Sequence, residues 1–244
     1  MAHLEAAVVS EQGPRPSMED RHVLRVDGDR ALGAVFDGHN GAAVAEYAAE
    51  QFPGQDREPV DEALRRVHAG SRGLRGGACA VAFRLAGPRL EVANVGDAEL
   101  AVVTGAGVSV LTEEHRLTNA AERARVQAAG AVLDGPYAVD PRTGEGLMPT
   151  RGVGDHAFAD IGIVCEPYRW SGPFAEGWLV AACDGLWDVL APEELPDYLT
   201  GSAAEAARAL AREALAVRGS FDNLTVIVLR RTQGSTLRGD ASSP

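Results

Sequence analysis

Three apolar segments of strand length each run into an aspartate that lies beside a glycine. The segments and the pairs that follow them are residues 31–36 with Asp37-Gly38, residues 92–95 with Gly96-Asp97, and residues 178–183 with Asp184-Gly185. Asp-Gly is also a common β-turn pair, and a plain turn is the alternative explanation at each position. However, a carboxylate at a strand end is poorly placed for a core, and a neighbouring glycine lets the backbone approach an ion as well. The repeated pattern predicts strands whose ends converge on a divalent cation.

Apolar alternation and helical periodicity indicate the remaining elements. We expect strands at residues 2–10, 21–27, 31–36, 78–86, 89–95, 98–104, 107–111, 178–183 and 224–229. Helices are expected at residues 40–51, 60–72, 120–129, 192–199 and 203–217, with an irregular stretch over 131–177. This order is neither regular βαβ alternation nor all-β, and it predicts an α+β domain of two antiparallel sheets with helices outside. Without a linker or repeat, we expect one domain over residues 1–231 and a disordered tail over 232–244.

The charged residues exclude several functions. The chain carries a net charge of −12, which argues against nucleic acid or an anionic membrane as a partner. All 23 basic residues are arginine, so a P-loop, a protein-kinase ATP site and Schiff-base chemistry are excluded, because each needs a lysine. The arginine and alanine bias suggests a GC-rich bacterial genome.

Cysteine content and apolar patterning bear on the compartment. Three widely spaced cysteines read as reduced thiols, and no apolar stretch is long enough to span a bilayer. The N-terminus also lacks the plan of a signal peptide. We expect a cytoplasmic protein without a membrane segment, and nothing in the sequence suggests more than a monomer.

Eight short motifs, in this order, resemble those of the metal-dependent protein serine/threonine phosphatases, the type 2C or PPM family. The resemblance covers residues 13–228. The motifs are Gly13-Pro14-Arg15 with Met18-Glu19-Asp20-Arg21, Val35-Phe36-Asp37-Gly38-His39-Asn40-Gly41, residues 77–80, Ala93-Asn94-Val95-Gly96-Asp97, Leu111-Thr112 with His115, Arg151 with Gly154-Asp155, Asp184-Gly185-Leu186-Trp187-Asp188, and Asp222-Asn223-Leu224-Thr225-Val226. The resemblance implies a four-layer α-β-β-α sandwich and a phosphoprotein phosphatase that takes part in bacterial signalling.

The resemblance also assigns a metal centre. It implies that Asp37 bridges two Mn²⁺ or Mg²⁺ ions that share a hydroxide. One ion would be held by Glu19 and the carbonyl of Gly38, and the other by Asp184 and Asp222. A weaker third ion would lie at Asp97 and Asp188.

The catalytic roles follow from the same resemblance. Arg15 would grip the substrate phosphate with its planar donor fork, and the alternative is an ion pair with Glu19. His39 would protonate the leaving serine or threonine oxygen, and the alternative is a cap on the following helix. Asp20 would orient a metal-bound water or His39. Asp155 is expected to be structural, and His115 a bystander.

Two other functions stay open at this point. A pseudophosphatase would keep the fold and bind a phosphoprotein without hydrolysing it, although such a protein is expected to lose ligands and this chain has lost none. A hydrolase of small phosphoesters would share the same motifs. The leading prediction is an enzyme that removes phosphate from phosphoserine and phosphothreonine on proteins, the targets of a serine/threonine kinase.

Overall fold

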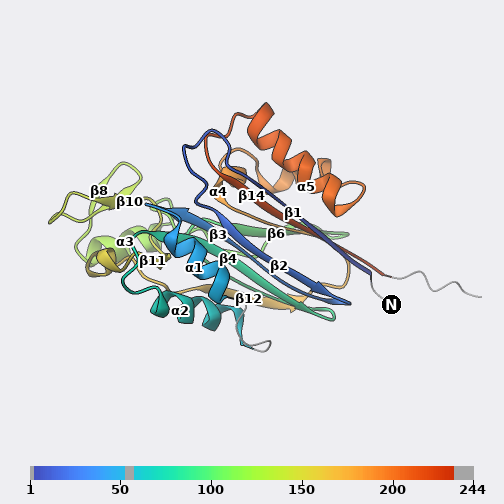
Figure 1. Cartoon of the computed structure of the whole chain (residues 1–244), viewed down its shortest axis with the longest axis horizontal. Coiled ribbons are helices and arrows are strands. Elements are labelled where there is room, and N and C mark those ends of the chain that lie inside the picture. The colour runs from blue at the N-terminus through green and yellow to red at the C-terminus, as the bar shows by residue number, and fades with distance from the viewer. Residues whose placement is uncertain (1–2, 53–57, 234–244) are drawn as a thin grey trace, which may run out of the picture.

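Two antiparallel sheets lie face to face in the computed structural model, which describes residues 3–52 and 58–233 (Figure 1). Helices cover both outer faces, so the layers run helix, sheet, sheet, helix. The predicted α+β architecture of two antiparallel sheets between helices is confirmed. Most of the tail predicted to be disordered, residues 234–244, lies outside the described residues.

The first sheet joins the two ends of the described chain. Its order is β1 (His3–Glu11), β14 (Leu224–Thr232), β13 (Gly177–Ala182), β6 (Glu99–Thr104) and β7 (Gly107–Val110). Its outer face packs against α5 (Ala203–Arg212), whose buried side is a stripe of alanines and Leu210. The short elements around α5 are α4 (Asp184–Trp187), η2 (Pro192–Asp197) and the single π-helical turn η3 (Glu213–Val217).

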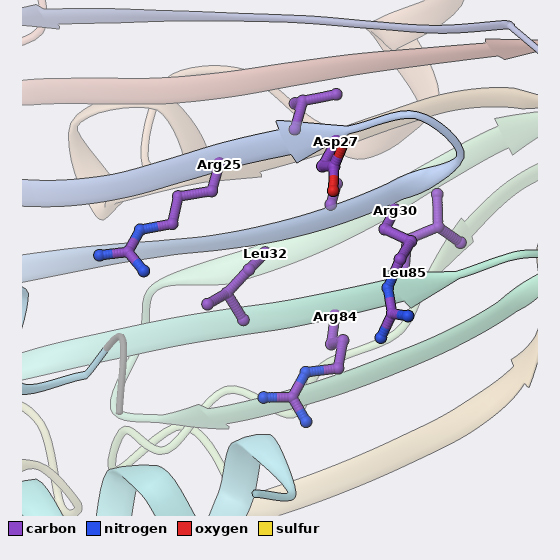
Figure 2. Close-up of a pocket in the computed structure, with 8 residues that line it drawn as sticks. Arg25, Asp27, Arg30, Leu32, Arg84 and Leu85 are labelled. Atoms are coloured by element: carbon purple, nitrogen blue, oxygen red, sulfur yellow. The ribbon is translucent and has the colours of Figure 1, made fainter. Parts of the chain in front are cut away.

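The second sheet lies under the two N-terminal helices. Its order is β12 (Tyr168–Pro173), β5 (Arg89–Val95), β4 (Gly77–Ala86), β3 (Arg30–His39) and β2 (Arg21–Asp27), and β11 (Val153–Gly154) pairs with the start of β4. Helices α1 (Ala43–Gln51) and α2 (Val60–Gly70) pack on its outer face. At the β2–β3 hairpin a hollow of about 370 Å³ opens on the sheet, and Figure 2 shows Arg25, Arg30 and Arg84 lining it.

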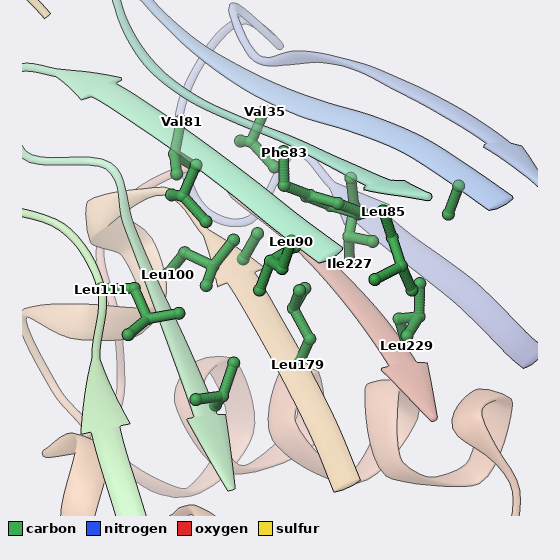
Figure 3. Packing of buried hydrophobic residues seen from close by; sticks show 14 of the residues in the cluster. Val35, Val81, Phe83, Leu85, Leu90, Leu100, Leu111, Leu179, Ile227 and Leu229 are labelled. Carbon is green, nitrogen blue, oxygen red and sulfur yellow. The ribbon is translucent and has the colours of Figure 1, made fainter. Parts of the chain in front are cut away.

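The main core fills the space between the sheets. Alternate residues of each strand point inward, so Val81, Phe83 and Leu85 of β4 meet Leu179 of β13 and Ile227 of β14 (Figure 3). Each of these side chains is fully buried. Burying a large aliphatic or aromatic side chain stabilises a fold by about 1.5–3 kcal/mol, so this layer fixes how the two sheets are held together.

The stretch predicted to be irregular contains regular structure, which corrects that expectation. A small sheet of β8 (Val132–Asp134), β9 (Tyr137–Val139) and β10 (Gly146–Leu147) packs beside α3 (Ala120–Ala128), and η1 (His156–Ile161) follows. The same stretch of sequence also contains the edge strand β12 of the second sheet, and Trp170 of this strand packs on the main core. Strands of two or three residues are too short to show a periodicity, so β8, β9 and β10 could not be predicted from the sequence.

Three predicted helices differ from the structure, and one of them, predicted over 203–217, is α-helical only as far as Arg212 and continues as η3. The helix predicted from residue 40 begins at Ala43, because Asn40 and Gly41 have φ angles of 57° and 110°, which a helix cannot use. The segment predicted as a helix at 192–199 is a 3₁₀ helix that contains Pro196. Within the described part of the chain, no helix combines the length and apolarity needed to cross a bilayer.

Candidate active site

A polar pocket of about 510 Å³ lies where strand ends of both sheets meet. It is lined by most of the residues singled out in the sequence, namely Arg15, Glu19, Asp37, Gly38, His39, Asp97, Asp184, Asp188 and Asp222. The hollow at the β2–β3 hairpin is unsuited to a divalent cation, because its charged lining is mainly arginine. It also lies far away: Arg30 begins β3 and His39 ends it, nine strand steps or about 30 Å apart.

Three carboxylates that each follow an apolar run come together in the pocket. One oxygen from each of Asp37, Asp97 and Asp184 lies within 4.8 Å of the others. Asp37 belongs to β3, Asp97 follows β5, and Asp184 begins α4 directly after β13. The three segments therefore converge from both sheets, as the repeated pattern predicts, and an isolated β-turn does not explain the arrangement.

The charges of this cluster repel one another. Burial raises the pKa of Asp37 well above its usual value, and the nearby Asp184 raises it further. Burial, with repulsion from Asp97, likewise raises the pKa of Asp184 to about 7. Buried carboxylates in this state take up protons or cations, so the cluster suits a hard divalent ion.

Asp20 lies beneath the pocket without a partner. It is 2% exposed, and neither of its carboxylate oxygens has a hydrogen-bond partner among the described residues. Burial raises the pKa of Asp20 to about 6. An oxygen of Asp20 also lies within 4.8 Å of ligand atoms from Asp37 and Cys183. Unpartnered buried carboxylate oxygens are what a bound ion or its waters would satisfy, so these residues fit a metal centre.

Glu19 and Asp222 both line the pocket, and both already accept hydrogen bonds from other residues of the chain. Glu19 accepts hydrogen bonds from the Ser17 hydroxyl at 2.9 Å and from the Gly41 amide at 3.0 Å. Gly38 lies against the Glu19 backbone, since a Cβ added there would lie 2.4 Å from the Glu19 carbonyl oxygen. Only glycine permits that approach, which explains the residue at this strand end.

Asn223 joins the first and last motifs. Its side-chain amide nitrogen donates to the carbonyls of Gln12 at 2.7 Å and Ser17 at 2.9 Å. Its amide oxygen accepts from the Glu19 backbone nitrogen at 2.8 Å. No role for Asn223 followed from the sequence, whereas in the structure its side chain ties Glu19 to the segment that carries Asp222.

Arg15 pairs with Asp222 and not with Glu19. Its Nη2 donates to Asp222 Oδ2 at 2.5 Å, and its Nε donates to the Phe221 carbonyl at 3.2 Å. The Arg15 side chain is 54% exposed, so its guanidinium stays accessible from the pocket mouth. The alternative surface pair with Glu19 is not formed.

His39 is held by Asp155. Its Nε2 lies 2.8 Å and 2.9 Å from the two carboxylate oxygens of Asp155. Burial lowers the pKa of His39, but the charge and hydrogen bond of Asp155 outweigh it, so the pKa is raised overall. The alternative, that His39 caps α1, does not hold, because that helix begins four residues later with Ala42 as its cap. Asp155 was expected to be structural, and its contact with His39 gives it a place in the site.

Arg116 lies inside the acidic cluster. It donates to Asp97, Asp184 and Asp188 at 2.7, 2.9 and 2.7 Å. Burial lowers the pKa of Arg116, while Asp97 and Asp188 raise it more strongly, so the side chain is a permanent cation. Arg116 could not be singled out from the sequence, although it directly follows His115 of one of the eight motifs.

Comparison with known proteins places the chain among phosphatases. The sequence model described as "Protein phosphatase 2C" matches residues 5–224. "Probable protein phosphatase 2C 45" of Oryza sativa subsp. japonica is 32% identical over 254 residues, covering 95% of this chain and 89% of the relative. "Probable protein phosphatase 2C 32" of the same plant is 30% identical, and there the matched region covers 91% of this chain and 64% of the relative.

Solved structures share the fold. Serine-threonine phosphatase 2C from Toxoplasma gondii superposes with a TM-score of 0.81 at 20% identity, over 94% of this chain and 95% of the other. The catalytic domain of the serine threonine protein phosphatase PstP, solved in complex with two manganese ions, gives a TM-score of 0.66 at 19% identity over 96% of this chain and all of the other.

Proposed function

The chain belongs to the protein phosphatase 2C family, and from that premise we propose that its acidic pocket hydrolyses phosphoserine and phosphothreonine esters on proteins. The chain is a metal-dependent serine/threonine protein phosphatase, a hydrolase. The observation that carries the assignment to this pocket is the convergence of Asp37, Asp97 and Asp184 within 4.8 Å. A guanidinium and an imidazole line the same pocket, so phosphate-binding and proton-donating groups stand beside the proposed metal centre.

Two Mn²⁺ or Mg²⁺ ions are proposed as the cofactors. Asp37 would be shared between them, with Glu19 and the Gly38 carbonyl on one side and Asp184 and Asp222 on the other. When bound, such ions polarise the phosphoryl group and lower the pKa of water so that it can attack phosphorus. The two manganese ions of the PstP catalytic domain support this count.

Arg15 is proposed to hold the substrate phosphate. A guanidinium can donate two parallel hydrogen bonds to one phosphate, which a lysine cannot. In the structure the same group donates to Asp222. Asp222 is also a proposed metal ligand, so a cation held there would compete with Arg15 for this carboxylate.

His39 is proposed to protonate the leaving oxygen of serine or threonine. The charge and hydrogen bond of Asp155 outweigh burial and raise the pKa of His39, which favours the protonated, proton-donating form of the ring. Asp155 also fixes the ring, because both of its oxygens lie at hydrogen-bond distance from Nε2. Asp20 would then orient a water beneath the pocket with its unpartnered carboxylate.

The substrates are proposed to be targets of a serine/threonine kinase, encountered in the cytoplasm by a monomer with a single domain over residues 1–231. Three unpaired cysteines, two of them buried, support a reducing compartment. Sedimentation or light scattering on the purified chain would test the monomer.

The function is tested by hydrolysis of a phosphothreonine peptide with Mn²⁺, with chelator, and by the Asp184→Asn variant. We expect activity that needs the metal and falls at least about 100-fold in the variant, because a ligand is lost. Asp27→Asn, an exposed aspartate at the distant hollow, is the matched control and should keep full activity.

Two outcomes would favour the other functions. A folded, metal-binding protein without activity on any phosphoester would be a binding protein. A small aryl phosphate that is hydrolysed while phosphopeptides neither react nor compete would indicate a small-phosphoester hydrolase.

A further inference from the structure

We propose that Arg116 is a built-in cation that takes the place of a third metal ion, so that this chain binds two divalent ions tightly and not three. Asp97 and Asp188, the residues that the family resemblance assigns to a third ion, both accept hydrogen bonds from Arg116. The inference rests on the proposed two-metal site and adds a positioning residue to it, since Arg116 also holds Asp184.

All three nitrogens of the guanidinium are used. Nε donates to Asp97 Oδ2 at 2.7 Å, Nη1 to Asp188 Oδ1 at 2.7 Å, and Nη2 to Asp184 Oδ2 at 2.9 Å. The Arg116 side chain is only 15% exposed, and that of Asp97 only 5%. Charge-assisted bonds to the desolvated Asp97 are stronger than surface ion pairs, and the planar fork reaches three carboxylates at once. The Asp188 side chain is 52% exposed, so its bond contributes less, and Asp97 Oδ1 has no hydrogen-bond partner among the described residues.

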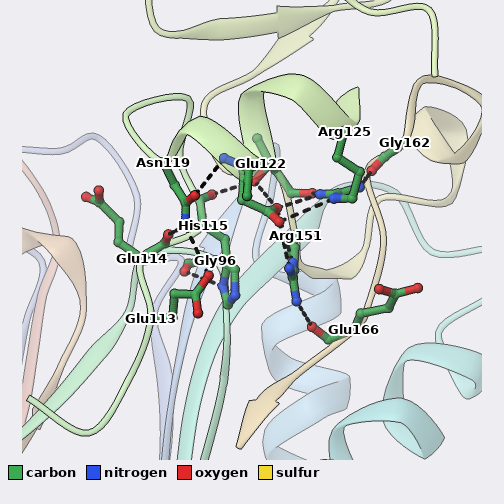
Figure 4. Close-up of polar contacts among 12 residues, drawn as sticks. Gly96, Glu113, Glu114, His115, Asn119, Glu122, Arg125, Arg151, Gly162 and Glu166 are labelled. Atoms are coloured by element: carbon green, nitrogen blue, oxygen red, sulfur yellow. Dashed lines mark hydrogen bonds and ion pairs between the residues drawn. The ribbon is translucent and has the colours of Figure 1, made fainter. Parts of the chain in front are cut away.

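The backbone beside Arg116 is fixed to the strand end that carries Asp97. The backbone nitrogen of His115 donates to the Gly96 carbonyl at 3.0 Å, and His115 Nδ1 lies 3.0 Å from the same oxygen (Figure 4). The His115 carbonyl accepts from both the amide and the hydroxyl of Thr150, at 2.8 and 2.9 Å. His115 precedes Arg116 and Gly96 precedes Asp97, so these bonds set the guanidinium and the carboxylate in register.

A second pair of bonds secures the same loop two residues before His115. Asn94 Nδ2 donates to the Glu113 carbonyl at 2.7 Å, and the Glu113 amide donates back to Asn94 Oδ1 at 3.2 Å. Asn94 is completely buried at the end of β5. The backbone that leads into Arg116 is therefore fixed to the end of β5, which Asp97 follows.

The position of Arg116 weakens the binding of a third ion. An ion held by both Asp97 and Asp188 would have to lie where the guanidinium now bridges them. Asp97 Oδ1 has no hydrogen-bond partner among the described residues, but an ion that reached it would face the positive charge of Arg116. Arg116 engages only Oδ2 of Asp184 and does not bond to Asp37, so the two proposed ions meet less competition there. Arg116 thus neutralises the cluster from one side and leaves the metal-binding side free.

The test is a count of bound Mn²⁺ by electron paramagnetic resonance or equilibrium dialysis, with no substrate and no turnover. We expect two tight ions in the wild type and three in Arg116→Met, with the third bound at least about tenfold more tightly than in the wild type. Arg123→Met, an exposed arginine on α3, is the matched control and should bind two.

The substitution Asp188→Asn tests whether the third ion binds where the Arg116 guanidinium lies in the wild type. It should leave the wild-type count at two and return the count in Arg116→Met from three to two. Arg116→Lys should stay at two, because the positive charge is retained. If Arg116→Met fails to fold, the wild type and Asp188→Asn alone decide the matter: a third tight ion in the wild type that Asp188→Asn removes would overturn the proposal.

Other results overturn it as well, and they differ from failure of the proposed function. Folded Arg116→Met that still binds two ions shows that the place is not a metal site. A wild type that binds fewer than two tight ions contradicts the proposed phosphatase site itself, whereas three tight ions contradict only the role of Arg116.

Discussion

His39 gains its proposed chemistry from a residue far away in the chain. Asp155 lies 116 positions away and holds the imidazole in the pocket. Its carboxylate also packs so closely on β4 that a Cβ added at Gly77 would lie 2.1 Å from Asp155 Oδ2. The imidazole is thus supported by the start of a buried strand, and its position follows from the fold.

We predict that His39→Asn slows hydrolysis of a phosphothreonine peptide by about 100-fold or more, the usual size of a general-acid contribution. Hydrolysis of an aryl phosphate should change only a few-fold, because a phenolate leaves without a proton. The measurement is kcat for both substrates with saturating Mn²⁺. Asp155→Asn should show the same pattern at smaller amplitude, and equal losses on the two substrates would contradict a proton-donor role.

The carboxylates of the pocket could be predicted from the sequence better than the residues that contact the site. Asp37, Asp97 and Asp184 each follow an apolar run, which is a local signal. Asp155 and Arg116 work through contacts with residues 19 to 116 positions away, and nothing beside them in the sequence marks those contacts. Only the packing of the two sheets creates them.

Among the elements, α3 is anchored through one buried carboxylate. Glu122, 1% exposed, accepts hydrogen bonds from Arg151 Nη2 at 2.6 Å, from Arg125 Nη2 at 2.5 Å and from the Thr150 hydroxyl at 2.7 Å (Figure 4). Arg151 in turn donates to the carbonyl of Glu166 at 2.6 Å. Glu122 therefore joins the small sheet and its helix to the segment that leads into β12.

We predict that Glu122→Gln lowers the free energy of unfolding by about 2–3 kcal/mol at pH 7. Burial raises the pKa of Glu122, but bonds from Arg151 and Arg125 outweigh it and lower the pKa to about 2, against 4.5 unfolded. A depressed acid pKa gives stability that is present above pH 4.5 and is lost as the pH falls towards 2. Urea unfolding of both proteins at pH 7 and pH 3 should show the difference shrinking in acid. A difference that does not change with pH would contradict the ion-pair explanation.

Element prediction succeeded where apolar patterns are long. Apart from β11 and β12, the strands of both sheets lie close to their predicted positions, as do the helices α1, α2, α3 and α5. Strand β12 was missed although Tyr168 and Trp170 alternate with polar residues, because the run is short and Gly172 and Pro173 end it. At the start of α3, Asn119 caps the helix by accepting from the Ala121 amide at 3.0 Å, whereas Glu122 bonds to the arginines.

The molecule as a whole carries a net charge of −12, and several of its buried carboxylates gather in one pocket. Their mutual repulsion opposes folding, and bound divalent cations relieve it. The site also draws on both sheets, so ions bound there link the two halves of the sandwich.

We predict that Mn²⁺ raises the thermal stability of the whole chain. At one hundred times its dissociation constant, a ligand that binds only the folded state adds about 2.7 kcal/mol. Calorimetry with Mn²⁺ and with chelator should show a rise in Tm that Asp37→Asn reduces strongly and Asp27→Asn leaves intact. An unchanged Tm on addition of Mn²⁺ would show that the pocket does not bind the ion.

The pairing of β1 with β14 determines where attached polypeptide leaves the molecule. His3 lies opposite Thr232 at one end of this strand pair, and Glu11 lies opposite Leu224 at the other, next to Asp222 of the pocket. A tag, tether or neighbouring domain joined before His3 or after Thr232 therefore leaves the molecule at the end of this strand pair that lies away from the active-site pocket. Because His3 and Thr232 are adjacent, a short linker could join them and new termini could be opened elsewhere in the chain. Such a circular permutation would leave the pocket open to a bulky phosphoprotein.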